Sequence, residues 1–285
     1  TELRKRNRIR TIHSSLVIEG NTLTFDQVTA LLEKKRVIAP LKDITEVKNA
    51  IRVYENIGLF DPFSIESLCE AHQILMDGLV ENAGRLRNKS VGIMKGKQLA
   101  HVAPSGTLVK SLLNDLFGYL ENDDEILLVK SCVFHYEFEF IHPFLDGNGR
   151  MGRLWQSVIL MKYNPVFEYL PVESLIKENQ EEYYRILAVA DRQGESTIFV
   201  EFMLRIVEES LEELLQSQNV TLTGRDRIAL FKDYIADASF TRKDYLRYFK
   251  ELSTATASRD LKEAVDSNQL RKEGEKSLTH YTYII

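Results

Sequence analysis

Two cysteines and the lack of any long apolar run narrow the classes to which this 285-residue chain can belong. Cys69 and Cys132 are too few for the disulfide framework that stabilises small secreted domains. The basic stretch at residues 4–10 resembles the start of a secretion signal, but only three apolar residues, 16–18, follow it. We therefore expect no secretion signal, no membrane span and a reducing, cytoplasmic setting.

The sequence also lacks internal repeats and low-complexity tracts, so we expect an ordinary globular architecture. With 44% hydrophobic and 28% charged residues, it has the material for a large core and a second, small domain. Apolar residues recur at helical spacing along most of the chain, which predicts a mainly α fold. The expected helices of the larger part cover residues 24–35, 44–57, 64–76, 109–120, 125–141, 149–163, 174–190 and 196–218.

A short segment, residues 142–153, carries most of the chemistry. Asp146, Gly147, Asn148 and Gly149 are typical of a turn, since Asp and Asn hydrogen-bond their own backbone and Gly accepts positive φ. Apolar residues at spacings of three and four follow as far as residue 163 and predict a helix. The loop therefore begins a helix, whose unpaired N–H groups and dipole favour an anion.

The side chains around this loop suit a nucleotide phosphate. Arg150 and Arg153 lie three residues apart, so both guanidinium groups can face the same phosphate oxygens. Pro143 must end the aromatic-rich helix before it, so the imidazole of His142 projects over the loop with a pKa suited to taking a proton. Asp146 is suited to hold Mg²⁺ beside phosphates. Together these residues predict phosphate transfer rather than binding alone.

The complete segment resembles the signature of the Fic family, whose members mostly transfer AMP from ATP to a hydroxyl of a target protein. The pattern His-Pro-Phe-Leu-Asp-Gly-Asn-Gly-Arg-x-x-Arg has no position missing. The resemblance implies that His142 is the general base, that Phe144 anchors the loop in the core and that Asp146 holds Mg²⁺. It also implies phosphate contacts from Gly147, Asn148, Gly149, Arg150 and Arg153, with Arg153 at the γ-phosphate.

Residues 15–20, Ser-Leu-Val-Ile-Glu-Gly, resemble the inhibitory helix that some Fic proteins carry at the N-terminus, (Ser/Thr)-x-x-x-Glu-(Gly/Asn). The resemblance implies an inhibitory helix at about residues 11–20, marked by Ser15, Glu19 and Gly20. Glu19 would pair with Arg153 and displace the γ-phosphate from a productive position. Stranding one charge of a buried pair costs roughly 3–5 kcal/mol, so the resting enzyme should have little activity.

Two short alternating runs, residues 90–94 and 98–102, predict a β-hairpin. It resembles the flap of Fic proteins, at about residues 89–103, whose open edge is thought to hold the target segment by strand addition. Residues 176–184 resemble the helix that lines the adenine pocket, where Asn179 would read the base edge and Tyr183 would pack on the nucleotide. His135 and Glu139 match no zinc spacing that we can justify, so we expect His135 to be a core residue.

A second domain is expected after the polar stretch 216–224. Residues 225–237, 241–249 and 253–268 predict three helices and 270–283 a hairpin, which together resemble a winged helix-turn-helix. From residue 221 onward twelve Lys and Arg stand against ten Asp and Glu, a net charge of +2 that is too small for a clear DNA-binding surface. DNA and a protein partner are therefore both open. The residues that would contact DNA are Ser253, Thr254, Thr256, Ser258 and Arg259.

The sequence thus predicts a Fic domain at residues 1–218 and a winged helix-turn-helix domain at residues 221–285. The expected function is that of a protein adenylyltransferase, which transfers AMP from ATP, with Mg²⁺, to a Ser, Thr or Tyr hydroxyl and is autoinhibited by Glu19. The open alternatives are a DNA-binding regulator with a nucleotide-sensing Fic-like domain, and a Fic enzyme that uses another nucleotide donor or removes AMP. His142 favours transfer, because sensing alone needs no base. The expected partner is a target protein on the flap, and a homodimer stays open.

Overall fold

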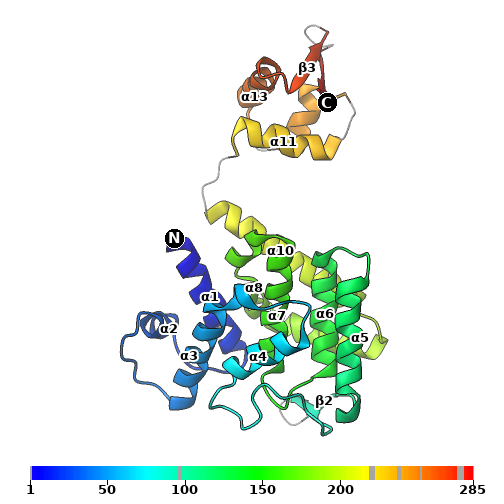
Figure 1. The fold of residues 1–285 in the computed structure, drawn as a ribbon. Helices are drawn as coiled ribbons and strands as arrows, with labels where there is room; N and C mark the ends of the chain where they lie inside the picture. Colours follow the sequence, from blue (N-terminus) through cyan, green and yellow to red (C-terminus); the bar gives the residue numbers. More distant parts are fainter. Residues whose placement is uncertain are drawn as a thin grey trace. The chain divides into compact units, whose positions relative to one another are not determined.

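The computed structural model describes residues 2–95, 98–217, 222–235, 239–250, 252–274 and 279–284. Within these residues the chain is mainly α-helical, which confirms the expected fold class. It divides into two compact units, Thr1–Leu215 and Gln216–Ile285, each described by itself below (Figure 1). Among the helices so described, none has both the length and the apolar character needed to cross a lipid bilayer.

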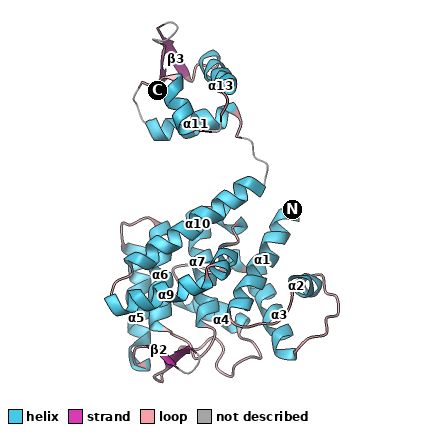
Figure 2. Cartoon of the chain, turned by 180° about the vertical axis from the view of Figure 1, so that it is seen from behind, coloured by secondary structure: helices cyan, strands magenta, loops and turns pink. Residues whose placement is uncertain are grey.

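The first unit is a helical bundle whose centre is formed by α6 (Leu127–Ile141) and α7 (Asn148–Tyr163), which pack on each other. Seen from both sides, the β-hairpin and the C-terminal end of α10 lie at opposite ends of this unit (Figure 2). The surrounding helices are α1 (Glu2–Ile18), α2 (Phe25–Leu32), α3 (Leu41–Glu55), α4 (Ile65–Leu75), α5 (Val109–Asn122), α8 (Val172–Glu178), α9 (Gln180–Gln193) and α10 (Thr197–Ser217). Short 3₁₀ helices lie at η1 (Ile57–Leu59), η2 (Gly106–Leu108) and η3 (Pro165–Tyr169).

Helix α6 contributes to two apolar cores. Phe134 and Phe138 are fully buried in the core that α1, α3, α4, α5 and α7 share. Cys132 and Tyr136 belong to a second core, built mainly by α8, α9 and α10. A helix that is apolar on most sides is expected to be central. Packing from both sides therefore fixes the C-terminal end of α6, where the signature segment begins.

The predicted hairpin is confirmed. Strands β1 (Gly92–Lys95) and β2 (Gln98–Val102) pair antiparallel, with Gly92 opposite Val102 and an irregularity in register between Ile93 and Met94. The predicted connection at Lys95 continues through residues 96 and 97, which lie outside the described residues.

Two predicted helix boundaries are wrong. The helix that carries the inhibitory pattern begins at Glu2 rather than near residue 11, because the basic stretch is helical as well. The single helix expected at residues 174–190 is two helices, α8 and α9, which meet at Asn179. There the carbonyl of Leu175 accepts both the side-chain amide and the backbone N–H of Asn179, each at 3.0 Å, and an asparagine that bonds nearby backbone groups in this way is favoured at helix ends.

The second unit has the predicted three helices and hairpin: α11 (Gly224–Ile235), α12 (Arg242–Tyr248), α13 (Thr254–Asp266), β3 (Leu270–Glu273) and β4 (His280–Tyr283). Strands β3 and β4 pair antiparallel, and Phe240 forms an isolated bridge with Tyr281. The predicted end of the first helix at residues 236–237 and the tip of the hairpin at residues 275–278 lie outside the described residues. The core of this unit contains Ile228, Phe231, Phe240, Tyr245, Ala257, Leu261, Ala264 and Leu270.

Candidate active site

The loop between α6 and α7 begins and ends with a left-handed residue. His142 follows α6 with φ 51° and ψ 60°, and Gly147 precedes α7 with φ 84° and ψ 7°. A non-glycine residue in this region is unusual, and such residues gather at functional sites. Gly147 is further required by space, since a β-carbon there would lie 2.7 Å from the Sδ atom of Met76.

A side-chain clamp closes the loop. The Oδ1 atom of Asn148 accepts the N–H of Phe144 at 2.8 Å, and its Nδ2 donates to the carbonyl of Phe144 at 2.9 Å. Phe144 is fully buried, which confirms the predicted core anchor. Because the amide of Asn148 is committed to this clamp, any contact of Asn148 with an anion falls to its backbone N–H.

His72 supports the loop from α4, and no sequence pattern singles it out. Its ring stacks on Phe144, with 3.7 Å between centroids. Its Nδ1 accepts the N–H of Gly84 at 2.8 Å, so we assign the proton to Nε2, which donates to the carbonyl of Asp146 at 3.0 Å. Burial lowers the pKa of His72 to about 4, so the ring is neutral at pH 7.

Arg87 is a second residue that the sequence reasoning missed. It is 3% exposed, and its Nε donates to the carbonyl of His142 at 2.6 Å. Its two Nη atoms donate to the carbonyls of Lys89 at 2.6 Å and Pro104 at 2.7 Å, which flank the hairpin. Arg87 therefore ties both ends of the hairpin to the backbone of His142. The bonds of Arg87 go to backbone carbonyls, so no sequence pattern singles it out.

Arg153 lies against the end of α1. It is 2% exposed, its Nε donates to Ser15 Oγ at 3.2 Å, and its Nη2 donates to the carbonyl of Ser15 at 3.1 Å. The same Nη2 lies 2.7 Å from Glu19 Oε1. Gly20 follows with φ 89° as α1 ends. The fold thus brings Ser15, Glu19 and Arg153 together, as the resemblance implies.

The carboxylate of Glu19 also lies over the start of α7. A β-carbon on Gly149 would lie 2.6 Å from Glu19 Oε1, so the missing side chain of Gly149 provides the space that this carboxylate fills. Burial alone would raise the pKa of Glu19, but Arg153, with smaller effects from Arg150 and His142, holds that pKa below its ordinary value. Glu19 is therefore an anion held at the N-terminus of a helix.

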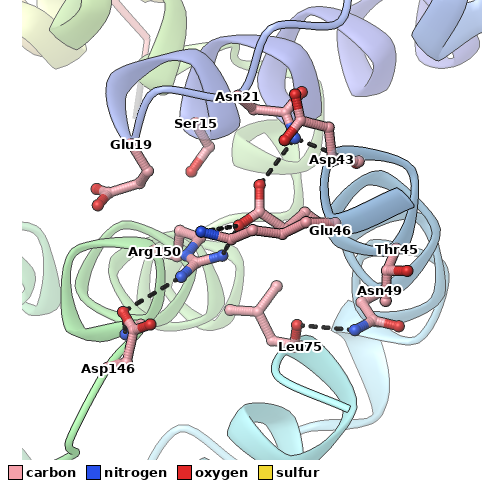
Figure 3. Close-up of polar contacts among 12 residues, drawn as sticks. Ser15, Glu19, Asn21, Asp43, Thr45, Glu46, Asn49, Leu75, Asp146 and Arg150 are labelled. Carbon is pink, nitrogen blue, oxygen red and sulfur yellow. Dashed lines mark hydrogen bonds and ion pairs between the residues drawn. The ribbon is translucent and has the colours of Figure 1, made fainter. Parts of the chain in front are cut away.

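Arg150 extends from α7 toward α3 and meets two carboxylates (Figure 3). Its Nη1 lies 3.3 Å from Glu46 Oε1 and its Nη2 lies 3.5 Å from Asp146 Oδ1. The side chain of Glu46 is 8% exposed and that of Asp146 is 60% exposed. Glu46 was not predicted. A charged residue four positions before Ala50 and seven before Val53, on the apolar stripe of α3, is the signal that could have found it.

Glu139 is a further buried acid near Arg153. Its side chain is 15% exposed, and its Oε1, 4.0 Å from His135 Nε2, has no hydrogen-bond partner within the described residues. Burial raises the pKa of Glu139 to about 7, which Arg153 opposes and Glu19 reinforces. In the sequence, Glu139 stands out only beside His135, as a candidate metal ligand.

The two residues predicted for the adenine pocket lie at the start of α9. Asn179 stands between α8 and α9, with its amide bonded to Leu175 as described above. Tyr183 is 1% exposed, and its hydroxyl lies 3.0 Å from His135 Nε2. His135 is fully buried and also bonds Gln156, which confirms it as a core residue. The roles of Asn179 and Tyr183 toward a base stay predictions.

The segment that carries this site is similar to known proteins. Residues 62–160 match the Fic/DOC family. The protein adenylyltransferase fic-1 of Caenorhabditis elegans is 31% identical over 238 residues, which are 76% of this chain and 44% of that protein. The protein adenylyltransferase Fic of Nematostella vectensis is 29% identical over 228 residues, which are 76% of this chain and 51% of that protein. The chain thus spans about half the length of these curated relatives.

Solved structures extend the similarity to both units. A Fic family protein from Desulfovibrio desulfuricans G20 is 42% identical, with a TM-score of 0.75 over 100% of this chain and 88% of that one. A Fic domain containing signaling protein from Bacteroides thetaiotaomicron VPI-5482, at 21% identity and a TM-score of 0.65 over 74% of this chain and 86% of that one, shares the fold. The helical bundle and its loop therefore have the Fic fold. The chain belongs to the Fic family.

Proposed function

We propose that the protein is an adenylyltransferase that transfers AMP from ATP to a Ser, Thr or Tyr hydroxyl of a target protein. The observation that carries this proposal is the carboxylate of Glu19, which is held by Arg153 over Gly149 at the N-terminus of α7. An anion in this place indicates an anion site, and its position beside the His142 loop suits a phosphate that reacts there. The names of the curated relatives support the same reaction.

In the proposed reaction the phosphates of ATP lie along the backbone of Gly147, Asn148 and Gly149. Arg150 grips them and Arg153 contacts the γ-phosphate. The target hydroxyl loses its proton to the imidazole of His142 as its oxygen attacks the α-phosphorus, and the bond to pyrophosphate breaks. Positioning and charge neutralisation supply most of the rate in reactions of this kind.

Asp146 is the residue that would hold Mg²⁺. Its side chain is 60% exposed, beside the N-terminus of α7, and Mg²⁺ typically binds through one or two carboxylates together with phosphate oxygens. Within the described residues no group of three or more His, Cys, Asp or Glu side chains could hold a metal ion, and a site shared with phosphates needs none. The bound ion would neutralise phosphate charge.

Glu19 is proposed to inhibit the resting enzyme. Because Arg153 is buried and bonded to Glu19, a γ-phosphate must replace this carboxylate to reach the arginine. The target segment is proposed to add to the hairpin of β1 and β2 by strand pairing, which gives affinity through main-chain hydrogen bonds. Arg87 would keep that hairpin in register with His142.

The test uses α-labelled ATP and Mg²⁺ with wild type, Glu19→Gly and Glu19→Gly/His142→Ala. We expect little label on protein with wild type, strong label with Glu19→Gly, and a loss of at least about 100-fold with the double variant, because general bases contribute about 10²–10⁴. Glu81→Gly, an exposed turn residue, is the matched control and should behave as wild type.

Each other outcome changes the proposal. Equal label from wild type and Glu19→Gly would remove inhibition by Glu19. Transfer retained by the double variant would remove His142 as the base. Label from another nucleoside triphosphate alone would change the donor, and loss of label from a preloaded target would reverse the direction. No transfer at all, with ATP bound, would favour a nucleotide-sensing regulator.

The second unit is proposed to be a winged helix that docks a partner. The exposed start of α13 and the hairpin of β3 and β4 are the surfaces that such a fold presents. Binding to duplex DNA that falls steeply with added salt would make it a DNA-binding module. No binding to duplex DNA at low salt would favour a protein partner.

A further inference from the structure

Glu46 occupies a place that the proposed mechanism does not explain. It is a buried carboxylate on α3, 7% exposed, far in sequence from the signature segment. Its Oε1 lies 3.3 Å from Arg150 Nη1, and its Oε2 accepts a hydrogen bond from Asn21 Nδ2 at 2.8 Å. Lys42 is 3.9 Å from Oε1 but its side chain is 75% exposed, so it is a weak competitor for this carboxylate.

Arg150 depends on Glu46 for its orientation. The side chain of Arg150 is 6% exposed, and its second contact, to Asp146, is long at 3.5 Å and reaches a side chain that is 60% exposed. Its Nε is buried and has no hydrogen-bond partner within the described residues. The firmest contact of Arg150 is therefore the one with Glu46, on the side of α3 (Figure 3). A planar guanidinium that is held from one side presents its other donors in a fixed direction.

Asn21 fixes Glu46 in turn. Its amide Nδ2 donates to Glu46 Oε2 and to the carbonyl of Asp43 at 3.1 Å, and its Oδ1 accepts the N–H of Leu23 at 3.1 Å. These three bonds fix the orientation of the Asn21 amide. Figure 3 shows the resulting series of contacts from Asn21 through Glu46 to Arg150. Asn21 lies two residues after Glu19, so one short segment contacts Arg153 directly through Glu19 and holds Glu46, the partner of Arg150, through Asn21.

We propose that Glu46 is the positioning residue of Arg150, which it holds in the orientation that binds the phosphates of the nucleotide. This inference rests on the proposed function, because it assumes that Arg150 contacts those phosphates. Glu46 itself does not touch the reacting atoms. Its removal leaves Arg150 present but free to turn toward Asp146 or solvent, so nucleotide affinity falls more than the chemical step does.

The test compares Glu46→Gln, Glu46→Asp, Glu46→Ala and Asn21→Ala, each combined with Glu19→Gly. Gln has the length of Glu and keeps an acceptor oxygen within hydrogen-bond distance of Arg150. Asp keeps the negative charge, but its side chain is one methylene shorter, so the carboxylate lies farther from Arg150. We expect the KM for ATP to rise a few-fold with Gln and at least about tenfold with Asp and Ala, while kcat changes less. Asn21→Ala, which leaves the carboxylate in place, should give a small rise. Glu55→Gln, exposed on the same helix, is the matched control.

For each variant, the Kd for ATP is measured by titration calorimetry, and the melting temperature is measured as well. A merely structural role would lower the melting temperature and leave the KM and Kd for ATP unchanged, which would overturn the inference. A KM order that follows charge, with Asp nearer the parent than Gln, would overturn it as well. If the Glu19→Gly parent binds ATP without AMP transfer, the proposed function fails and the Kd series still tests Glu46. If the parent binds no ATP, both fail.

Discussion

The Arg153–Glu19 pair of the first unit and the Arg227–Asp260 pair of the second join the same kinds of group but differ in construction. Arg227 Nε and Nη2 contact both oxygens of Asp260, at 2.6 and 2.8 Å, and the hydroxyl of Tyr245 adds a third bond at 3.2 Å. Glu19 contacts Arg153 through one oxygen at 2.7 Å, and its side chain is 30% exposed.

This difference indicates in which pair a ligand could replace the carboxylate. The side chain of Asp260 is 3% exposed and accepts three hydrogen bonds, so a ligand would have to break all three to take its place. The carboxylate of Glu19 is at the end of α1, beside a glycine and the start of a helix, where phosphate oxygens could bind the same arginine. A buried ion pair alone is thus weak evidence for a switch, and the open, one-point geometry of Glu19 is the feature that supports it.

The largest effect on stability is expected from Asp260→Ala, which tests the closed pair. It strands Arg227 in a partly buried position, so the second unit should lose roughly 3–5 kcal/mol of unfolding free energy. Trp155 is the only tryptophan and is buried in the first unit, so its fluorescence reports that unit, whereas far-ultraviolet circular dichroism reports both. In a urea titration we expect circular dichroism to show a new transition at lower urea, when the second unit unfolds. The midpoint measured by Trp155 fluorescence should not change.

The control for this experiment is Asp266→Ala, an exposed change on the same helix, which should leave both transitions in place. AMP transfer by Glu19→Gly should be unaffected by Asp260→Ala if the target docks on the hairpin of the first unit. A shift of the fluorescence midpoint of Trp155 would show that the Arg227–Asp260 pair stabilises the first unit as well as the second, which would contradict this prediction.

The second prediction concerns Glu139, the acid beside the open pair. Its pKa is raised to about 7 from an ordinary 4.5, mainly by burial, so its contribution to stability is fully present below pH 4.5 and is lost as the pH rises through 7. The groups that face it include Arg153, Glu19, His135, Tyr183 and Tyr184. Glu139→Gln stays neutral, so above pH 7 it should be more stable than wild type by up to roughly 3 kcal/mol.

Unfolding free energies of wild type and Glu139→Gln, measured from pH 4.5 to 8, check this prediction. The two proteins should be closest at pH 4.5, and the gap should open toward pH 8. Glu121→Gln, exposed on α5, should give no such trend. A constant gap would mean that folding does not raise the pKa of Glu139 above its ordinary value.

Much of the site was predictable because it is local in sequence. The loop, the left-handed turn at Gly147 and the helix after it follow from residue types within residues 142–153. The contact of Glu19 with Arg153 spans most of the first unit, and only a resemblance could suggest it. The elements of the second unit followed from periodicity and turn residues, within a few positions at each end.

The residues that escaped prediction act through the backbone or across the bundle. Arg87 and His72 bond carbonyls of the loop, and a carbonyl carries no sequence signature. Glu46 meets Arg150 only once α3 packs on α7. Asn179 stands between α8 and α9, and its amide bonds a carbonyl of α8. One asparagine is a weaker sequence signal than the apolar periodicity that predicted one continuous helix.

The smallest effect is expected from Glu19→Gln, which tests whether the open pair is exchangeable. Gln keeps an acceptor, Ser15 keeps both of its bonds to Arg153, and water reaches the site, so the loss of stability should be roughly 1–2 kcal/mol. Because the competing carboxylate is gone, Mg²⁺ with ATP should raise the melting temperature more in Glu19→Gln than in wild type. Glu178→Gln, exposed at the end of α8, is the control and should match wild type in both respects. If ATP raised the melting temperatures of wild type and Glu19→Gln equally, Glu19 would not compete with the nucleotide, and the open pair would be as structural as the closed one.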